Sequence, residues 1–547
     1  MLFVVTELEK PVGGLYRFSA EYLKTWRKLR AKGKTKFEPL VFSLKDEFSP
    51  PNDLVESRKF ADLPDNCKVF EGKRGDVDCF FLQSTLSDKR LEEFQTRLYN
   101  EYGINSWGAK SWNFYMQLNS FWKHLPLVVE RFKNEIVLVD CQDWLAFPAG
   151  VRLKEEFGFP LYCRFHSNEY GRALGEPNYD SPQLTSEVLA LQEADFIQSV
   201  SVTEANFLVR NYLPLKRDLR KRLEKSKPKK WVEQQKNIEE GYRAFLRQKL
   251  DERKQNALEL FSERVGALPN AIVLDPWKEA TGKDIQAGVE LYSQLLPKSK
   301  FKCLFIGRPT HIKGIYVLLE ALKLLHDKGN KEIGLVVASH FDEEALKAFL
   351  KHIQELGISE SVSVRNGWVD EDTKKRLFCA ADAIVLPSLY EPFGIVVLEA
   401  LAADYACEKN GARGPITIVS DCGGMSETIA DGVNGLKIPL KARFKIDAAD
   451  LAVVLEKARE TQGLKQKLSA GGAKQALNSH YTWESVLEKS FDFYDRAIEN
   501  AGKNQFGAVL RKIKDSLAEP STTPLHSLKA FGKKIRWENG ENEGAKS

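Results

Sequence analysis

The feature that most constrains the fold is an alternation of short apolar runs with helix-forming stretches, which occurs twice along the 547 residues. Runs such as 135–140 and 160–165 are mostly apolar, as is typical of strands buried on both faces. Strand, helix and strand at this spacing predict βαβ units and a parallel sheet. The expected strands are 2–6, 135–140, 160–165 and 193–201 in the first half and 301–307, 333–339, 361–367, 383–388 and 415–420 in the second.

These two blocks predict an α/β protein with two Rossmann-like domains facing each other across a cleft, and such sheets bind ligands at the carboxyl ends of their strands. Between the blocks the sequence becomes highly charged and helix-favouring, which predicts an inserted helical segment. The last residues are charged and then rich in Ser, Thr and Pro, as in a flexible tail. The expected divisions are an N-terminal domain at 1–204, the insertion at 205–268, a C-terminal domain at 269–480, a helix at 481–502 and the tail at 503–547.

Composition excludes several classes of protein. With 43% hydrophobic and 29% charged residues and no long apolar run, the chain is neither a disordered protein, a coiled-coil rod nor a membrane span. The 81 basic and 76 acidic residues leave a net charge of only +5, so no nucleic-acid partner is expected. The eight cysteines are scattered without zinc spacing, and the first strand starts at residue 2 with no basic leader before it. We therefore expect a cytoplasmic protein with reduced thiols.

One basic segment stands out against this near-neutral balance. Residues 216–230, within the expected insertion, carry many Lys and Arg residues. A solvated helical hairpin and a docking surface for an anionic partner, including a peripheral membrane surface, are both compatible with that pattern.

Two loops that follow expected strands carry features suited to an anion. Gly13 and Gly14 precede a helix, which lets the backbone approach a ligand and leaves helix N-terminal amides free, although a tight structural turn would explain them equally well. Arg308 and Lys313 follow the strand at 301–307. A guanidinium fork and a point charge at this edge would complement a pyrophosphate; the alternative is two solvated cations.

The stretch YEPFG (390–394) places Glu391 directly before a proline, with Glu399 eight residues further on. Proline suits the first turn of a helix, so Glu391 is expected at the mouth of a helix and Glu399 about 12 Å further along it. The two carboxylates could then contact different parts of one extended ligand, and they are too far apart to act as an acid/base pair on one bond. The alternative is a solvated carboxylate and a capping residue.

His166 directly follows the strand at 160–165, where a ligand role and a structural role are equally open. Its expected position is the cleft edge of the N-terminal sheet. The remaining histidines show no metal-binding spacing, and the chain contains neither G-x-S-x-G nor a P-loop. We therefore expect no metal and no cofactor.

Taken together and in this order, the motifs resemble the two-domain (GT-B) retaining glycosyltransferases, in particular the glycogen/starch synthase-like branch and relatives with the E-x7-E motif of the glycosyltransferase family 4 type. The resemblance spans most of residues 1–500 and leaves out 205–295 and 503–547. The matching stretches are KPVGGL (10–15), DCQDWLAFPAGVRL (140–153), YCRFHSNEYGR (162–172), ADFIQSVSVTE (194–204), FIGRPTHIKG (305–314), ADAIVLPSLYEPFGIVVLEALA (381–402), IVSDCGGMSETIADGVNGLKI (418–438) and YTWESV (481–486).

The resemblance implies an acceptor-side N-terminal domain, a nucleotide-sugar-binding C-terminal domain and a helix at 481–502 that packs back on the N-terminal domain. Arg308 and Lys313 would hold the donor diphosphate, Glu391 would contact the sugar hydroxyls, and Glu399 would reach the ribose. The implied catalytic residues are His166, Arg308, Lys313 and Glu391. The implied donor-binding residues are Lys10, Gly13, Gly14, Arg308, Lys313, Glu391, Phe393, Gly394, Ile395 and Glu399.

The leading hypothesis is thus a retaining, metal-independent transfer of a sugar, glucose from ADP-glucose or UDP-glucose, to an α-glucan acceptor, as in glycogen biosynthesis. A glycosyltransferase of the same fold with a lipid-linked, small-sugar or sugar-phosphate acceptor is the alternative. A non-catalytic regulatory or sugar-binding protein on the same scaffold is a third hypothesis, which intact motif residues disfavour.

Overall fold

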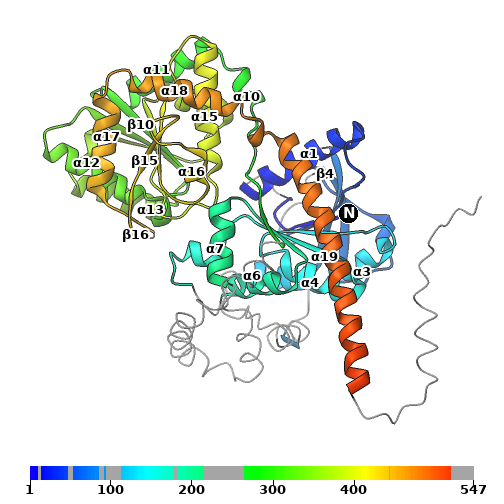
Figure 1. The fold of residues 1–547 in the computed structure, drawn as a ribbon. Coiled ribbons are helices and arrows are strands. Elements are labelled where there is room, and N and C mark those ends of the chain that lie inside the picture. Colours follow the sequence, from blue (N-terminus) through cyan, green and yellow to red (C-terminus); the bar gives the residue numbers. More distant parts are fainter. Residues whose placement is uncertain are drawn as a thin grey trace, which may run out of the picture. The chain divides into compact units, whose positions relative to one another are not determined.

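The computed structural model describes residues 1–9, 14–46, 53–74, 76–84, 92–93, 96, 112–177, 181–212, 264–442 and 444–518. The chain divides into a compact unit at Met1–Ile498 and a second unit at Glu499–Ser547. The first unit contains two parallel-sheet halves, each covered by helices (Figure 1). Lys10, Gly13 and the basic segment 216–230 lie outside the described residues.

The N-terminal half is built on a nine-stranded sheet in the order β3-β4-β5-β2-β1-β6-β7-β8-β9. All neighbouring pairs from β5 to β9 are parallel, whereas β3 and β4 add an antiparallel edge. The strands are β1 (Leu2–Val5), β2 (Leu40–Leu44), β3 (Val55–Glu56), β4 (Cys67–Arg74), β5 (Val77–Ser84), β6 (Val139–Gln142), β7 (Leu161–Phe165), β8 (Phe196–Ser199) and β9 (Val265–Ala267).

The C-terminal half contains a six-stranded sheet, all parallel, in the order β12-β11-β10-β13-β14-β15. This is the strand order of a doubly wound sheet, and the order reverses between β10 and β13. The strands are β10 (Phe301–Ile306), β11 (Ile333–Ser339), β12 (Val362–Asn366), β13 (Ala383–Leu386), β14 (Ile416–Ser420) and β15 (Leu436–Ile438), beside a small hairpin of β16 (Leu440–Ala442) and β17 (Lys445–Ile446). The predicted α/β class with parallel sheets is confirmed.

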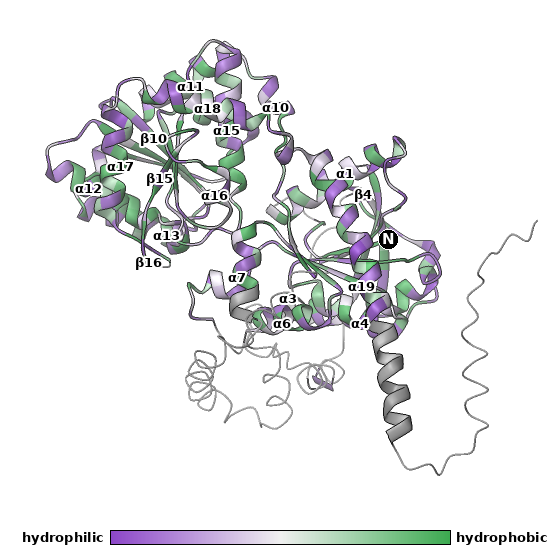
Figure 2. Cartoon of the chain, in the orientation of Figure 1, coloured by the Kyte–Doolittle hydropathy of each residue, from purple (hydrophilic) through white to green (hydrophobic). Residues whose placement is uncertain are grey.

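Helices cover both sheets, and Figure 2 shows hydrophobic residues concentrated along the strands. In the N-terminal half they are α1 (Gly14–Ala31), α3 (Trp112–Val129), α4 (Phe147–Phe157), α5 (Glu169–Arg172), α6 (Pro182–Glu193) and α7 (Val202–Tyr212). In the C-terminal half they are α10 (Asp275–Lys278), α11 (Gly282–Leu295), α12 (Ile315–Asp327), α13 (Glu343–Glu355), α14 (Glu371–Ala380), α15 (Ile395–Lys409), α16 (Gly423–Thr428), α17 (Ala448–Glu460) and α18 (Leu464–Ala476), followed by α19 (Trp483–Ala518). Among the described residues, none of these helices is both long and apolar enough to cross a bilayer.

The first turns of α19 return to the N-terminal sheet. Trp483, Leu487 and Tyr494 are buried in one apolar cluster with Phe3 of β1 and Trp26 of α1. The helix expected at 481–502 therefore corresponds to the start of α19, which continues past residue 503, where the tail was expected, to Ala518. The sequence between 503 and 518 is rich in strong helix formers, which favours this continuation.

Both ends of the expected insertion, 205–268, contain elements of the N-terminal half. Helix α7 runs across residue 204, and β9 lies before residue 268 and pairs in parallel with β8. Short strand β9 escaped the sequence analysis because three residues, VGA, carry too little apolar signal.

Candidate active site

The point at which the C-terminal strand order reverses brings Lys313 and Glu391 together. Lys313 ends a 3₁₀ turn (His311–Lys313) after β10, and its Nζ forms an ion pair with Oε2 of Glu391, in the loop after the neighbouring strand β13. The two loops are joined by a hydrogen bond from the Leu389 amide to the Ile312 carbonyl, at 2.7 Å. Both charged side chains stay partly exposed, at 22% and 16%. The pair is thus fixed by backbone but open to a ligand.

Gly314 explains why this turn takes its shape. It adopts a φ of 71°, and a Cβ there would lie 1.8 Å from the Pro387 carbonyl oxygen. Only glycine permits this approach. The backbone after Lys313 is therefore pressed against the chain that leads to Glu391.

The helix after YEPFG begins later than the sequence suggested. Gly394 has a φ of 90° and caps α15, whose first residue is Ile395, so Pro392 precedes the helix and is not in its first turn. The expected helical rise from Glu391 to Glu399 is therefore wrong, since only Glu399 lies in α15. The left-handed glycine interrupts the helical path that a proline at its first turn would have begun.

The loop residues around Glu391 are held by packing. Phe393 is 4% exposed and belongs to the apolar core of this half, against which Ile395 also packs. A Cβ on Gly423 would lie 1.7 Å from the Glu391 carbonyl oxygen, so α16 presses on the same loop. Phe393 thus acts as an anchor of the loop.

Glu399 accepts a hydrogen bond from the buried side chain of Lys374. Nζ of Lys374 on α14 lies 2.7 Å from Oε1 of Glu399 and also 2.7 Å from Oε2 of Glu371. Arg17 of α1, which the sequence analysis did not single out, has Nη1 3.8 Å from Oε1 of Glu399 and Nη2 3.3 Å from Oε1 of Glu371. Glu399 is therefore the meeting point of α14, α15 and α1.

Arg308 is exposed, and its guanidinium makes no hydrogen bond or ion pair with the residues that the structure describes. Its charge, together with that of Arg172, lowers the pKa of Glu7, which partial removal from water raises more strongly. Glu7 follows β1 and was not anticipated. Gly14, which was expected to precede the helix, is the first residue of α1.

His166 lies one residue after β7 and is partly buried. Its Nε2 is 3.1 Å from Oε1 of Gln142, and its ring packs edge-on against Phe18, with the centroids 4.6 Å apart. Burial, aided by the charge of Arg164, lowers the pKa of His166 to about 3, so the imidazole is neutral at pH 7. Within the described part of the chain, neither His166 nor Arg308 has a hydrogen bond or ion pair to Lys313 or Glu391.

Asp143, after β6, is a further polar residue at the same edge that the sequence analysis did not assign. It has a φ of 62°, is 7% exposed and lies 3.7 Å from Nη2 of Arg172 through its Oδ2. Burial raises the pKa of Asp143 to about 6, and its Oδ1 has no hydrogen-bond partner among the described residues. A strained backbone and an unpaired buried oxygen are typical of functional sites.

Tyr390 joins the loop of Glu391 to the loop of His166. Its hydroxyl accepts hydrogen bonds from N and Nδ2 of Asn168, both at 3.1 Å, and donates to Glu204. All three side chains are buried. The only sequence signal was that each lies in a stretch that matched the family motifs, because the contact itself joins residues 186 to 222 positions apart.

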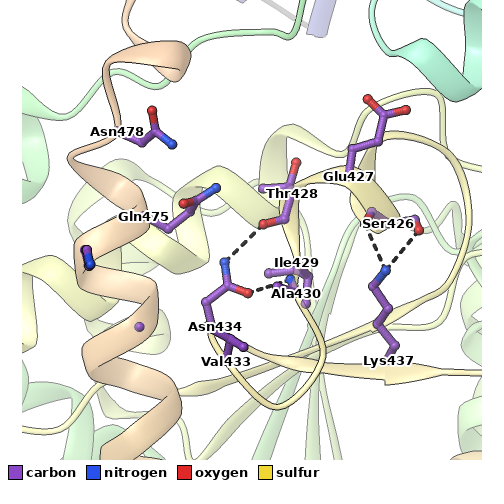
Figure 3. A pocket seen from close by; sticks show the side chains of 12 residues that line it. Ser426, Glu427, Thr428, Ile429, Ala430, Val433, Asn434, Lys437, Gln475 and Asn478 are labelled. Carbon is purple, nitrogen blue, oxygen red and sulfur yellow. Dashed lines mark hydrogen bonds between the residues drawn. The ribbon is translucent and has the colours of Figure 1, made fainter.

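A cavity of 680 Å³ lies elsewhere in the C-terminal half, between the loop after α16 and α18 (Figure 3). Lys437 donates to Ser426, and Asn434 bridges Thr428 and Ala430, as the dashed lines show. Its lining contains none of the predicted site residues. Over the described ranges, no group of three or more His, Cys, Asp or Glu residues could hold a metal ion.

Residues 291–475 match the family of glycosyl transferases group 1. An uncharacterised glycosyltransferase of Methanocaldococcus jannaschii is 25% identical over 369 residues, which cover 67% of this chain and 77% of that protein.

Two solved structures share the fold over almost their whole length. Sucrose-phosphate synthase from Thermosynechococcus elongatus has a TM-score of 0.56 at 16% identity and covers 94% of this chain and 99% of its own. The catalytic domain of starch synthase IV from Arabidopsis thaliana, bound to ADP and acarbose, has a TM-score of 0.58 at 14% identity and covers 91% and 98%. The chain therefore has the GT-B type of α/β fold, and residues 291–475 are similar to the glycosyl transferases of group 1.

Proposed function

We propose that this protein is a retaining, metal-independent glycosyltransferase that transfers glucose from a nucleotide-sugar to an α-glucan. The observation that carries the proposal is the Lys313–Glu391 pair at the reversal of strand order, with exposed Arg308 in the loop after the same strand β10. Ligands bind to doubly wound sheets at this point. The starch synthase with a similar fold binds ADP and acarbose, which supports an ADP-type donor and a glucan acceptor here.

When the donor binds, its diphosphate pairs with the side chains of Arg308 and Lys313. Arg308 offers a fork of donors, and Lys313 a point charge, to phosphate oxygens. When the bond between the sugar and the diphosphate breaks, negative charge develops on the diphosphate, and fixed cations stabilise it without reorganising. Because Lys313 then also pairs with phosphate, Glu391 can accept hydrogen bonds from the sugar hydroxyls. Gly14 at the start of α1, with Lys10 and Gly13, would close on the diphosphate, and Glu399 would reach the ribose.

The acceptor attacks from the face that the diphosphate leaves. Its hydroxyl oxygen forms the new bond to the anomeric carbon as the bond to phosphate breaks, and its proton passes to a phosphate oxygen. The configuration is retained and no side chain has to act as a base. Neutral His166 is a hydrogen-bonding group in this scheme and not a general acid, because an imidazole with a pKa of about 3 is not in the imidazolium form at pH 7.

A sugar-phosphate acceptor is the second candidate. Arg172 lies at the same edge of the N-terminal sheet and is 41% exposed despite its contact with Asp143. Its guanidinium could bind a phosphate on the acceptor. The similar fold of sucrose-phosphate synthase supports this candidate.

The test is a panel of nucleotide-sugars, each incubated with glycogen, maltose, a sugar phosphate and a lipid acceptor, with release of the nucleoside diphosphate as the readout. We expect release from ADP-glucose or UDP-glucose with glycogen or maltose, and a loss of about 100- to 1,000-fold in Lys313→Ala. Lys323→Ala removes an exposed ion pair on α12 and serves as the matched control. Wild-type rates in Lys313→Ala would refute the assignment of the site.

A further inference from the structure

A hydrogen-bonded set of buried side chains lies beneath His166. Oε1 of Gln142 faces Nε2 of His166 at 3.1 Å, and Nε2 of Gln142 donates to Oδ1 of Asp140 at 2.5 Å. The other oxygen of Asp140 accepts from the hydroxyl of Tyr494 on α19. Asp140 and Gln142 both lie on β6 and are fully buried. These hydrogen bonds therefore connect His166 to the buried core of the N-terminal half.

Burial raises the pKa of Asp140 to about 6 although the charge of Arg164 lowers it, so at pH 7 Asp140 is mainly the ionised acceptor. Nη2 of Arg164 lies 3.8 Å from Oδ2 of Asp140 and donates to the hydroxyl of Tyr22 at 2.9 Å. Its guanidinium carbon lies 4.7 Å from the ring centroid of Tyr22 and 5.6 Å from that of Tyr162. Arginine only donates hydrogen bonds and stays charged, so a carboxylate beside it is the complementary partner. An ionised carboxylate can only accept.

The direction of each proton follows from this. Since Asp140 accepts, the nitrogen of the Gln142 amide must face it, and the amide oxygen must face His166. An amide oxygen has no proton, so Nε2 of His166 must donate. In a neutral imidazole with a proton on Nε2, the second nitrogen, Nδ1, carries the lone pair.

We propose that Asp140 and Gln142 are positioning residues that hold His166 in the Nε2–H tautomer, so that the lone pair on Nδ1 is what His166 offers to a ligand. The group opposite must then be a hydrogen-bond donor, and in the proposed function it is a sugar hydroxyl. This ligand rests on the proposed function, whereas the tautomer does not. The groups that face His166 are Gln142, the ring of Phe18, the charge of Arg164 and Asp143, which accepts from the His166 backbone amide.

The first experiment measures the tautomer directly. Protein labelled with ¹⁵N in histidine is observed at pH 7 by long-range ¹H–¹⁵N correlation, and the His166 signals are identified by their loss in His166→Phe. We expect one neutral tautomer, protonated at Nε2, in the wild type. Gln142→Leu, which removes the acceptor, should give a mixture of the two tautomers.

Gln198→Leu is the matched control for loss of a buried amide. Gln198 lies on β8, the strand next to β7. It is 1% exposed, and its side chain accepts a hydrogen bond from the hydroxyl of Tyr162. Its removal leaves a comparable defect in the same core but does not touch Gln142 or His166. We expect the His166 tautomer in this variant to match the wild type.

Asp140→Asn gives the sharpest outcome, a reversal. The Asn oxygen can still accept from Tyr494, which turns its NH₂ group toward Gln142. The Gln142 amide must then rotate, present its oxygen to the Asn and its NH₂ to His166, and make Nε2 an acceptor. His166 is expected in the Nδ1–H form. Because loss of this carboxylate also leaves Arg164 unpaired, thermal unfolding is measured in parallel, and the two Gln142 and Gln198 variants decide the question if Asp140→Asn does not fold.

The second experiment measures the effect on the reaction. We expect Gln142→Leu to lower kcat/KM about tenfold, equivalent to one well-formed hydrogen bond, with a wild-type rate in Gln198→Leu. In a series of donors with one hydroxyl replaced by fluorine, one analogue should react slowly with the wild type and show no additional loss with Gln142→Leu, because fluorine cannot donate to Nδ1.

Clear outcomes would overturn the proposal. They are an Nδ1–H tautomer in the wild type, or a single wild-type tautomer retained in Gln142→Leu. Failure of every nucleotide-sugar to react would sink the proposed function alone, since the tautomer is read from the free protein.

Discussion

The two halves of the first unit hold their charged groups in different ways. In the N-terminal half, Arg164 and Asp140 are fully buried and surrounded by tyrosine hydroxyls and rings. In the C-terminal half, Lys313 and Glu391 pair directly but remain partly exposed. A buried charge set is fixed because removing one member leaves the others unpaired, whereas an exposed pair can exchange its partner for a ligand. The charged side chains of the N-terminal half are thus held in one arrangement, whereas those of the C-terminal half can exchange their partner for a ligand.

The largest expected effect tests this contrast through stability. Arg164→Met should lower the free energy of unfolding by about 3–5 kcal/mol, because Asp140 is left as an uncompensated buried charge. Lys313→Met should change it by less than about 1 kcal/mol, because its pair is partly exposed. Urea unfolding of both variants measures this difference. Equal losses would mean that the two ion pairs are held alike.

The next effect concerns pH and Asp143. Its pKa is raised from 3.8 to about 6 in the folded protein, so the folded state binds the proton more tightly and stability falls as pH rises through that window. Above pH 6 the cost is fully present, at up to about 3 kcal/mol. Asp143→Asn should therefore gain stability relative to the wild type between pH 4 and pH 8, as urea unfolding at several pH values would show.

His166 provides the opposite sign as a control. Its folded pKa of about 3 lies below the ordinary 6.5, so its contribution is present above pH 6.5 and is lost as pH falls toward 3. His166→Phe should therefore gain relative stability on acidification. If the stability of both variants relative to the wild type rose in the same direction of pH change, one of the two groups could not be buried in the folded protein.

A smaller effect tests the contact between the halves. Tyr390→Phe removes the hydroxyl that joins Asn168 and Glu204 and leaves their buried polar atoms with one partner fewer, which should cost about 1–3 kcal/mol. We expect the rate of transfer to fall as well, because the loops of Glu391 and His166 lose their shared bond. Tyr316→Phe, which keeps the ring of a tyrosine on α12, is the control. An unaltered rate in Tyr390→Phe would show that the two loops are positioned independently.

The smallest effect is expected at Arg17. Its side chain is 54% exposed and pairs with Glu371 and Glu399. Arg17→Ala should change the free energy of unfolding by no more than about 0.5 kcal/mol, as exposed ion pairs do. The KM for the donor is the more sensitive measurement, since Glu399 would lose its contact with α1. A destabilisation as large as that of Tyr390→Phe would mean that this ion pair holds the halves together.

The sequence predicted the fold best where strands are buried on both faces. Strands β10 to β14 were all found, and β11, β13 and β14 are buried over their whole length, as a parallel sheet between two helix layers requires, whereas β12 at the edge of the sheet carries Ser363 and Arg365. Strands β2 to β5 were missed: β3 and β4 form an antiparallel edge with several exposed residues, whereas β2 and β5 are mostly buried and their apolar runs were overlooked. A search for apolar runs therefore finds buried parallel strands more readily than antiparallel strands at the edge of a sheet.

The site was predictable where it follows strand ends. The resemblance named Lys313 and Glu391, and the reversal of strand order brings them together across 78 positions. Asp143 and the Tyr390–Glu204 contact were not found, because their significance arises from burial and from contacts that only the folded chain creates. Glu7 was not found because the charged neighbours that act on it, Arg172 and Arg308, are far from it in the sequence. Pro392 misled the prediction of the helix start, since Gly394 with its positive φ decides where α15 begins.

Helix α19 makes the N-terminal half dependent on the order of synthesis. Tyr494, which donates to Asp140 on strand β6 of the N-terminal sheet, belongs to the last turns that pack on this sheet. The core around Trp26 therefore stays open until nearly 500 residues have been made. The C-terminal half, by contrast, contains its own complete sheet and can close first. A chain that stops before residue 483 would expose a large aromatic surface to solvent and to chaperones, and the packing around His166 would be among the last parts of the protein to form.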